Sequence, residues 1–235
     1  SSSVMSRDDN CVAPSPGSSF AGRVITATEA AGFAGAVLKG TDFRNSTLHN
    51  LSFAGSELIG VDFSDAKLHH VDLTGARLED CYFKDAKLSR CRFVRARIDR
   101  VSFERSTLEL CDFYRASYVS SVVLRNTVMT RCSLHLTELQ GAELRLASLH
   151  GLAQEDPQSL RILHEMGQMD SRESKGLCKP HNRLYGALET YQGLVGHFES
   201  KGLYRDATTA YVMSKRTETS REVALAMHHK GTSRY

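Results

Sequence analysis

Residues 41–65 read TDFRN STLHN LSFAG SELIG VDFSD, and a large apolar residue stands third in every group of five. The same spacing runs from Phe33 to Tyr118 and resumes, after one inserted residue, from Leu124 to Leu149. Together the two registers contain twenty-four repeats. A second series of mostly small side chains, such as Ala66, lies two places before each large one.

A period of five fits neither of the common secondary structures. At about 100° per residue the large side chains would spread around an α-helix, and in a strand an odd spacing would turn them to alternate faces. The chain must therefore turn once in each repeat. Both apolar series then point into one interior while the other three residues face solvent, which is typical of a solenoid.

The number of repeats in each coil follows from the alternation of Phe with Leu or Ile, which has a ten-residue period. Four repeats per coil would stack Phe on Phe in two opposite columns, whereas three per coil would mix the columns. We therefore predict a four-sided coil of twenty residues. The predicted core centres include Phe43, Phe63, Phe83, Phe93, Phe103 and Phe113.

These repeats resemble the unit of the pentapeptide-repeat family, Ala-(Asp/Asn)-Leu-X-X. The groups TDFRN at 41–45, VDFSD at 61–65 and VDLTG at 71–75 carry the resemblance, which covers about half of the chain. It implies a mainly β protein. Residues 31–150 would form a right-handed parallel β-helix of about six four-sided coils, stacked about 4.8 Å apart.

The two ends of the chain differ from the repeats. Residues 1–30 contain serines, prolines and no apolar periodicity, which predicts a disordered leader or an N-terminal cap. Residues 151–235 are predicted to be α-helical. Asp156 before Pro157 marks a helix start, and two further helices are expected at about 182–200 and 204–229.

The last two helices should pack as an antiparallel hairpin because only a short connection separates them. This hairpin is similar to a single tetratricopeptide-like unit. The similarity rests on Tyr191, Leu194, Phe198, Gly202, Ala207 and Tyr211. The hairpin would cover the unpaired backbone edge of the last coil. Contact with a partner, or with a second copy of the chain as a homodimer, is the alternative role.

The sequence offers no convincing catalytic or metal-binding set. Cys81, Cys91, Cys111 and Cys132 occupy the small inward position, where a reduced thiol packs as a small hydrophobe. The pair Cys178 and His181 lacks a third group to orient it. The histidines do not have the spacing of a helical zinc site, although His49 and His69 should stack on one solvent face. We therefore expect no enzyme activity, no cofactor and no metal.

Positive charge is concentrated in the middle of the repeats. Between residues 84 and 105 eight cations face only three carboxylates. Folded on a square coil, they would form a belt around the rod that could contact an acidic protein, an anionic lipid or, less readily, nucleic acid. This candidate basic belt comprises Lys84, Lys87, Arg90, Arg92, Arg95, Arg97, Arg100 and Arg105.

Two functions compete on this sequence. Some pentapeptide-repeat proteins resemble duplex DNA in shape and negative charge and engage DNA gyrase, but residues 31–150 carry 16 positive and 14 negative residues. The sequence therefore favours a non-enzymatic protein-interaction or scaffolding module, with a partner of unknown identity. Reduced cysteines and the lack of a membrane span or signal peptide favour a bacterial cytoplasmic protein, and a secreted effector is the alternative.

Overall fold

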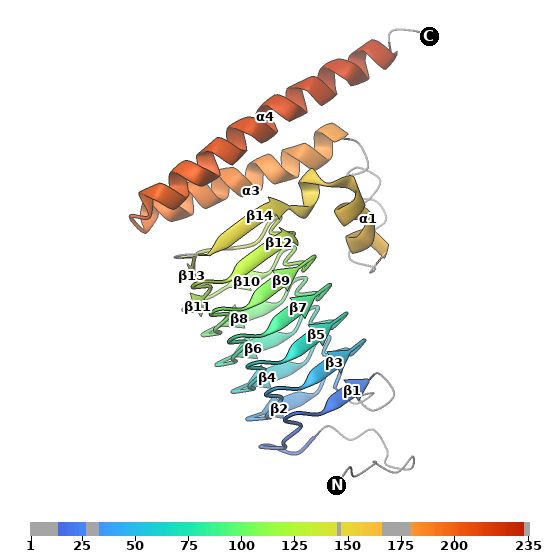
Figure 1. Cartoon of the computed structure of the whole chain (residues 1–235), viewed down its shortest axis with the longest axis vertical. Helices are drawn as coiled ribbons and strands as arrows, with labels where there is room; N and C mark the ends of the chain where they lie inside the picture. Colours follow the sequence, from blue (N-terminus) through green and yellow to red (C-terminus); the bar gives the residue numbers. More distant parts are fainter. Residues whose placement is uncertain (1–13, 27–32, 145–146, 166–179, 233–235) are drawn as a thin grey trace.

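The structure is a computed structural model that describes residues 14–26, 33–144, 147–165 and 180–232. A stack of short parallel strands forms a rod, and helices lie across its far end (Figure 1). Seven strands form the first side of the rod: β1 Val24–Thr26, β3 Thr47–His49, β5 Lys67–His69, β7 Lys87–Ser89, β9 Thr107–Glu109, β12 Val128–Cys132 and β14 Ser148–Leu152. The opposite side contains β2 Val37–Lys39, β4 Glu57–Ile59, β6 Arg77–Glu79, β8 Arg97–Asp99 and β10 Ser117–Tyr118.

The strand register confirms the predicted coil of four repeats. Leu48 pairs with Leu68 and Leu68 with Leu88, so each coil takes twenty residues. Single parallel bridges, such as Asp42 to Asp62 and Asp72 to Arg92, close the two remaining sides. The pair β11 Val122–Val123 and β13 Ala142–Glu143 continues one of these sides. The predicted parallel β-helix of about six coils is therefore confirmed.

The Phe columns fill the interior as the alternation predicted. Phe63 stacks on Phe43 and Phe83 with ring centroids 5.0 and 4.8 Å apart, and Phe93 stacks on Phe113 at 4.7 Å. Rings of the two columns meet edge to face at about 6 Å, a favoured aromatic geometry. All six predicted core centres are fully buried.

Most corners depend on a residue with positive φ, two places after a repeat centre. Gly, Asn and Asp occupy most corners of the early coils, as expected where the left-handed region is needed. After a Phe centre the corner is a hydrogen-bonded turn, as in the bond from Ser56 N–H to the carbonyl of Phe53. The Ser56 hydroxyl donates to the same carbonyl, which satisfies a small polar group inside the core.

The described N-terminal residues exclude one of the two predicted alternatives, a disordered leader or an N-terminal cap, over their range. Residues 14–26 are not disordered, because Phe20 stacks on Phe43 at 5.1 Å and β1 pairs with β3. Phe20 and Ile25 are themselves five residues apart, but eight residues separate Ile25 from Phe33. This break in the period hid a further partial coil from the sequence analysis.

The residue inserted after Tyr118 produces a local bulge that leaves the coil closed. Both inward series resume at once, since Val122 and Leu124 are fully buried. The bulge lies against Gly141 of the next coil. A Cβ at Gly141 would lie 2.5 Å from backbone atoms of residues 118–120. The insertion and this glycine are therefore structurally matched.

Helical segments follow the last coil. The 3₁₀ turn η1 Ala153–Glu155 leads into α1 Pro157–Glu165, and the predicted cap is confirmed because the Asp156 carboxylate accepts from the Ser159 hydroxyl at 2.6 Å. The hairpin consists of α3 Pro180–Ser200 and α4 Tyr204–Thr232. It turns at Gly202, with φ 69°, in a Schellman motif closed by bonds from Gly202 N–H to Glu199 and from Leu203 N–H to Phe198.

The hairpin packs on the end of the rod, and α4 runs on past α3 (Figure 1). Tyr191, Leu194 and Phe198 of α3 belong to the same buried cluster as the coil interior. Glu155 connects both helices to the last coil, because it accepts from the Tyr191 hydroxyl at 2.8 Å and from the Thr217 hydroxyl at 3.1 Å. These contacts support the predicted covering role.

Phe83→Ala should lower the free energy of unfolding by about 3–5 kcal/mol, because it leaves a cavity between two stacked rings. The control Lys84→Ala, at an exposed position, should change it by less than about 0.5 kcal/mol. Denaturant titration of both variants is the measurement. Equal effects would mean that the inward register is misassigned.

Gly141→Ala should cost about 1–3 kcal/mol, because the neighbouring backbone must move to admit a methyl group. The matched control is Gly196→Ala in α3, where a Cβ meets no atom within 4 Å. That change should stabilise by up to about 1 kcal/mol through helix propensity. Thermal unfolding compares the two, and a neutral Gly141→Ala would contradict the tight contact.

Candidate functional site

The inward cysteines are structural residues. Cys81, Cys91, Cys111 and Cys132 are buried free thiols. Burial raises the pKa of Cys81 to about 12 and raises the pKa values of Cys111 and Cys132, so these thiols stay protonated and weakly reactive. Cys178 lies outside the described residues. Within the described part of the chain, no group of three potential ligands could hold a metal ion.

The eight residues of the basic belt are not one uniform surface. Three of them are already paired with carboxylates. Arg100 contacts Glu79, Asp80 and Asp99, while Arg105 contacts Asp85 at 2.6 Å. Arg92, with a side chain only 21% exposed, lies 3.4 Å from Asp72. The belt therefore contains ion-paired members that hold neighbouring coils together and members that remain available to solvent.

Four of the belt arginines occupy four successive corners of one coil. Arg90, Arg95, Arg100 and Arg105 have φ values between 51° and 56°. The left-handed region costs a residue with a Cβ roughly 1–2 kcal/mol. Asp80 and Asp85 lie at the same corners of the preceding coil. Their carboxylates accept hydrogen bonds from the guanidinium groups of Arg100 and Arg105 at 2.8 Å. These contacts give a structural reason for arginine at two of the corners.

A shallow groove of about 560 Å³ crosses the side of the rod built by β3, β5, β7 and β9. Lys67 and Lys87 line it at matching positions of successive coils, and His49 and His69 lie beside them. His49 and His69 lie one above the other on this face, as predicted, and their rings meet edge to face with centroids 5.3 Å apart. Lys87 belongs to the candidate basic belt, whereas Lys67 lies one coil outside it.

Electrostatics in this groove are positive. Partial burial, followed by repulsion from His49 and Arg90, lowers the pKa of His69. Partial burial and repulsion from His69, Arg90 and His49 likewise lower the pKa of His70. The two rings lie 4.4 Å apart, edge to face. These imidazoles are therefore neutral near pH 7 and can take up protons when an anion approaches.

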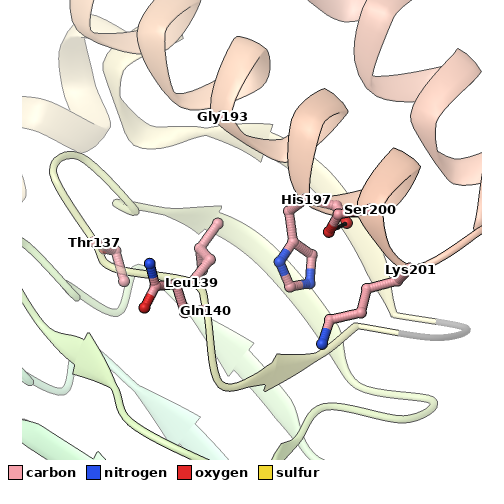
Figure 2. Close-up of a pocket in the computed structure, with 7 residues that line it drawn as sticks. All are labelled: Thr137, Leu139, Gln140, Gly193, His197, Ser200 and Lys201. Carbon is pink, nitrogen blue, oxygen red and sulfur yellow. Dashed lines mark hydrogen bonds between the residues drawn. The ribbon is translucent and has the colours of Figure 1, made fainter.

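A second cavity, of about 360 Å³, lies where α3 meets the last coil (Figure 2). His197 projects from α3 into it, with Lys201 on one side and Gln140 on the opposite wall. Burial, together with Lys201, lowers the pKa of His197. A neutral imidazole, a hydroxyl and an amide can hydrogen-bond a small polar group there. Sequence analysis missed this cavity, because nothing in the five-residue pattern places α3 over residues 137–140.

Arg92 belongs to a charged column on the side that contains the bridges Asp72–Arg92–Asp112–Ser133. Asp112 is buried, with its carboxylate accepting from the Tyr114 N–H at 2.9 Å. Burial raises its pKa to about 6, and hydrogen bonds from Tyr114 and Ser133 and the charge of Arg92 only partly oppose this effect. This carboxylate destabilises the fold when it is ionised.

Comparison with known proteins agrees with this geometry. The family model described as a pentapeptide repeat region matches residues 27–103. No curated protein matches the chain.

Solved structures include three informative likenesses. A pentapeptide repeat protein from the Arabidopsis thaliana thylakoid lumen is 24% identical over 43% of this chain and 67% of its own, with a TM-score of 0.33. QnrB1, a plasmid-mediated fluoroquinolone resistance protein, is 19% identical over 57% of this chain and 70% of its own, with a TM-score of 0.34. HetL, a pentapeptide repeat protein involved in heterocyst differentiation regulation in Nostoc sp. strain PCC 7120, is 18% identical over 58% of this chain and 85% of its own, with a TM-score of 0.25.

Asp112→Asn should stabilise the protein at neutral pH, because Asn keeps an acceptor for the Tyr114 N–H and removes a buried charge. The pKa of Asp112 is raised, so its favourable contribution is present below about pH 4 and is lost as the pH rises through about 6. The gain above that range is on the order of 2–3 kcal/mol. Denaturant titrations across this pH range are the measurement.

The matched control is Asp42→Asn. A hydrogen bond from Arg44 lowers the pKa of Asp42 to about 2, which is the opposite direction. Its ionised form is therefore the stabilising one, and the control should lose stability at neutral pH and match the native protein only in strong acid. Parallel pH profiles of the two variants would contradict the assignment for Asp112.

Proposed function

Because this chain carries a pentapeptide repeat region, we propose that it is a non-enzymatic protein-interaction or scaffolding module. The β-helix acts as a rigid rod, and α3 and α4 cap it and offer a second docking or dimerising surface. Buried reduced thiols suit a cytoplasmic location, which is part of the proposal.

One observation carries this proposal. The fold depends on the two inward positions of each repeat, and the residues on either side of each centre point outward and vary from coil to coil. The first side carries Lys67, Lys87 and His69, whereas the opposite side carries Arg77, Glu79 and Asp99. One rigid core therefore presents chemically different flat sides, which is what a scaffold needs.

The end of α4 adds a second surface of a different kind. Val223 and Met227 lie one helical turn apart and are 50% and 69% exposed, and Val212 is 43% exposed. Exposed apolar residues on one helix are typical of contact surfaces. They support the docking or dimerising role of the hairpin beyond its contact with the last coil. None of the described helices has a stretch long and apolar enough to cross a membrane.

The experiment that tests the module is quantitative affinity capture with the full chain and with two double variants. Lys67→Glu with Lys87→Glu alters the first side, and Arg77→Glu with Arg97→Glu alters the same positions on the opposite side. Binding of a specific partner should be lost in one double variant and kept in the other. Capture that does not depend on either side, in variants that keep the native thermal stability, would contradict the proposal.

The alternative function, a DNA-mimicking modulator of DNA gyrase, conflicts with the charge of the rod. A mimic must present negative sides to a site built to hold phosphates. Here the charged strand residues that line the groove of the first side are Lys67, Lys87 and Glu109, and two corners carry ion-paired arginines. The charge distribution therefore favours the scaffolding role.

Equimolar purified protein should not protect gyrase from a quinolone in a DNA supercoiling assay, because its surface lacks the charge that mimicry requires. The control is a gyrase-protecting protein of known activity under the same salt conditions. Clear protection by the native chain would reverse the choice between the two functions.

A further inference from the structure

The side of the rod built by β3, β5 and β7 gathers cations that have no carboxylate partner. In the described part of the chain, no carboxylate lies within ion-pair distance of Lys67, Lys87 or Arg90. On the opposite side Arg77 contacts Glu79 at 2.8 Å, and Arg100 reaches three carboxylates. Lys67, Lys87 and Arg90 therefore gather unpaired positive charge beside the groove.

Three histidines extend this charge. His49 and His69 pair across neighbouring coils, and His70 occupies the next corner with φ 52°. The corner that follows in the same column is Arg90. Glu109, at one end of the groove, is the only carboxylate among its lining residues. The groove thus contains lysines from two successive coils with histidines beside them.

We propose that this groove binds an acidic polypeptide segment of a partner protein, and that binding strengthens as the pH falls. The inference rests on the proposed scaffolding function and names the chemistry of its partner. Lys67, Lys87 and Arg90 attract the carboxylates at any physiological pH, and His69 and His70 add charge when they are protonated.

The shape of the site favours a polypeptide over the other polyanions. Three coils at about 4.8 Å span only about 10 Å, so the groove would meet few of the charges that duplex DNA presents every ~1.7 Å along its axis. A bilayer is flat and would lie across this shallow groove rather than along it. A single extended chain fits it, and its carboxylates can meet Lys67 and Lys87.

The pH dependence follows from linkage. The groups that face His69 and His70 are His49 from β3, Lys67 from β5, Lys87 from β7 and Arg90 at the next corner, with Glu109 from β9 beyond them. Apart from Glu109 all are cations or titrate to cations. A bound carboxylate offsets their repulsion and favours the protonated imidazoles. Binding therefore takes up protons, and affinity rises as the pH falls.

The test uses the whole chain and a fluorescently labelled oligoglutamate peptide as the probe. Anisotropy titrations should show affinity at about pH 5.5 that exceeds affinity at about pH 7.5 by about fivefold or more. Lys67→Glu with Lys87→Glu should weaken binding by at least about tenfold. The matched control, Arg77→Glu with Arg97→Glu, makes the same charge change at the same strand positions of the opposite side and should retain binding.

His69→Gln with His70→Asn separates the pH effect from binding itself. Asn suits the positive φ at residue 70. This variant should keep the weaker binding seen at higher pH and lose its increase in acid. Retention of the full increase would overturn the role of the two histidines.

Two further probes complete the test, namely anionic phosphatidylserine vesicles and duplex DNA at matched total charge. Tighter binding of either one than of the peptide, or equal loss of peptide binding in both double variants, would overturn the proposal. Failure of the peptide to bind, while a captured partner still depends on one side of the rod, would overturn this inference and leave the scaffolding function standing.

Discussion

The hydrogen bonding between successive coils is the constraint on which the rest of the structure depends. Every coil pairs in parallel with the next, so residues twenty positions apart must have equal roles. An inward Phe then lies directly above another Phe, and an outward Lys above another Lys. Packing energy accumulates in the columns of the interior. Surface charge accumulates in columns on the sides. Cations of successive coils therefore lie one strand spacing apart, unless a carboxylate occupies the matching position of one coil.

This constraint explains why the arginines of the belt differ in function. At two corners an aspartate one coil earlier meets the arginine, so the column alternates in sign and stabilises the stack. On the side of β5 and β7 lysine follows lysine, and the column carries repulsion that an anionic ligand would relieve. Basic residues therefore hold neighbouring coils together at one place and form a binding surface at another. The residue twenty positions away decides between the two.

The hairpin of α3 and α4 covers the open edge at the end of the rod. The last coil leaves backbone groups and apolar side chains that would pair with another molecule. Tyr191, Leu194 and Phe198 of α3 extend the interior over that end, and Glu155 fixes the hairpin through two hydroxyl groups. Because α4 packs on α3 and continues past it, its exposed apolar residues are left for another contact (Figure 1).

The sequence by itself determined the coil, because a five-residue period with alternating Phe admits one arrangement of the interior, and it also located the start of α1 at Asp156 and the short connection between α3 and α4. It predicted the eight residues of the basic belt but not their pairing, since ion pairs such as Arg100 with Asp80 depend on stacking across coils and on side-chain geometry. The partial coil at residues 14–26 escaped it because the period breaks before Phe33. Only the tertiary structure decided which cations face a groove, which lie beside a carboxylate and which coil α3 covers. Each of these depends on contacts between residues that are far apart in the sequence, and no local sequence pattern marks such contacts.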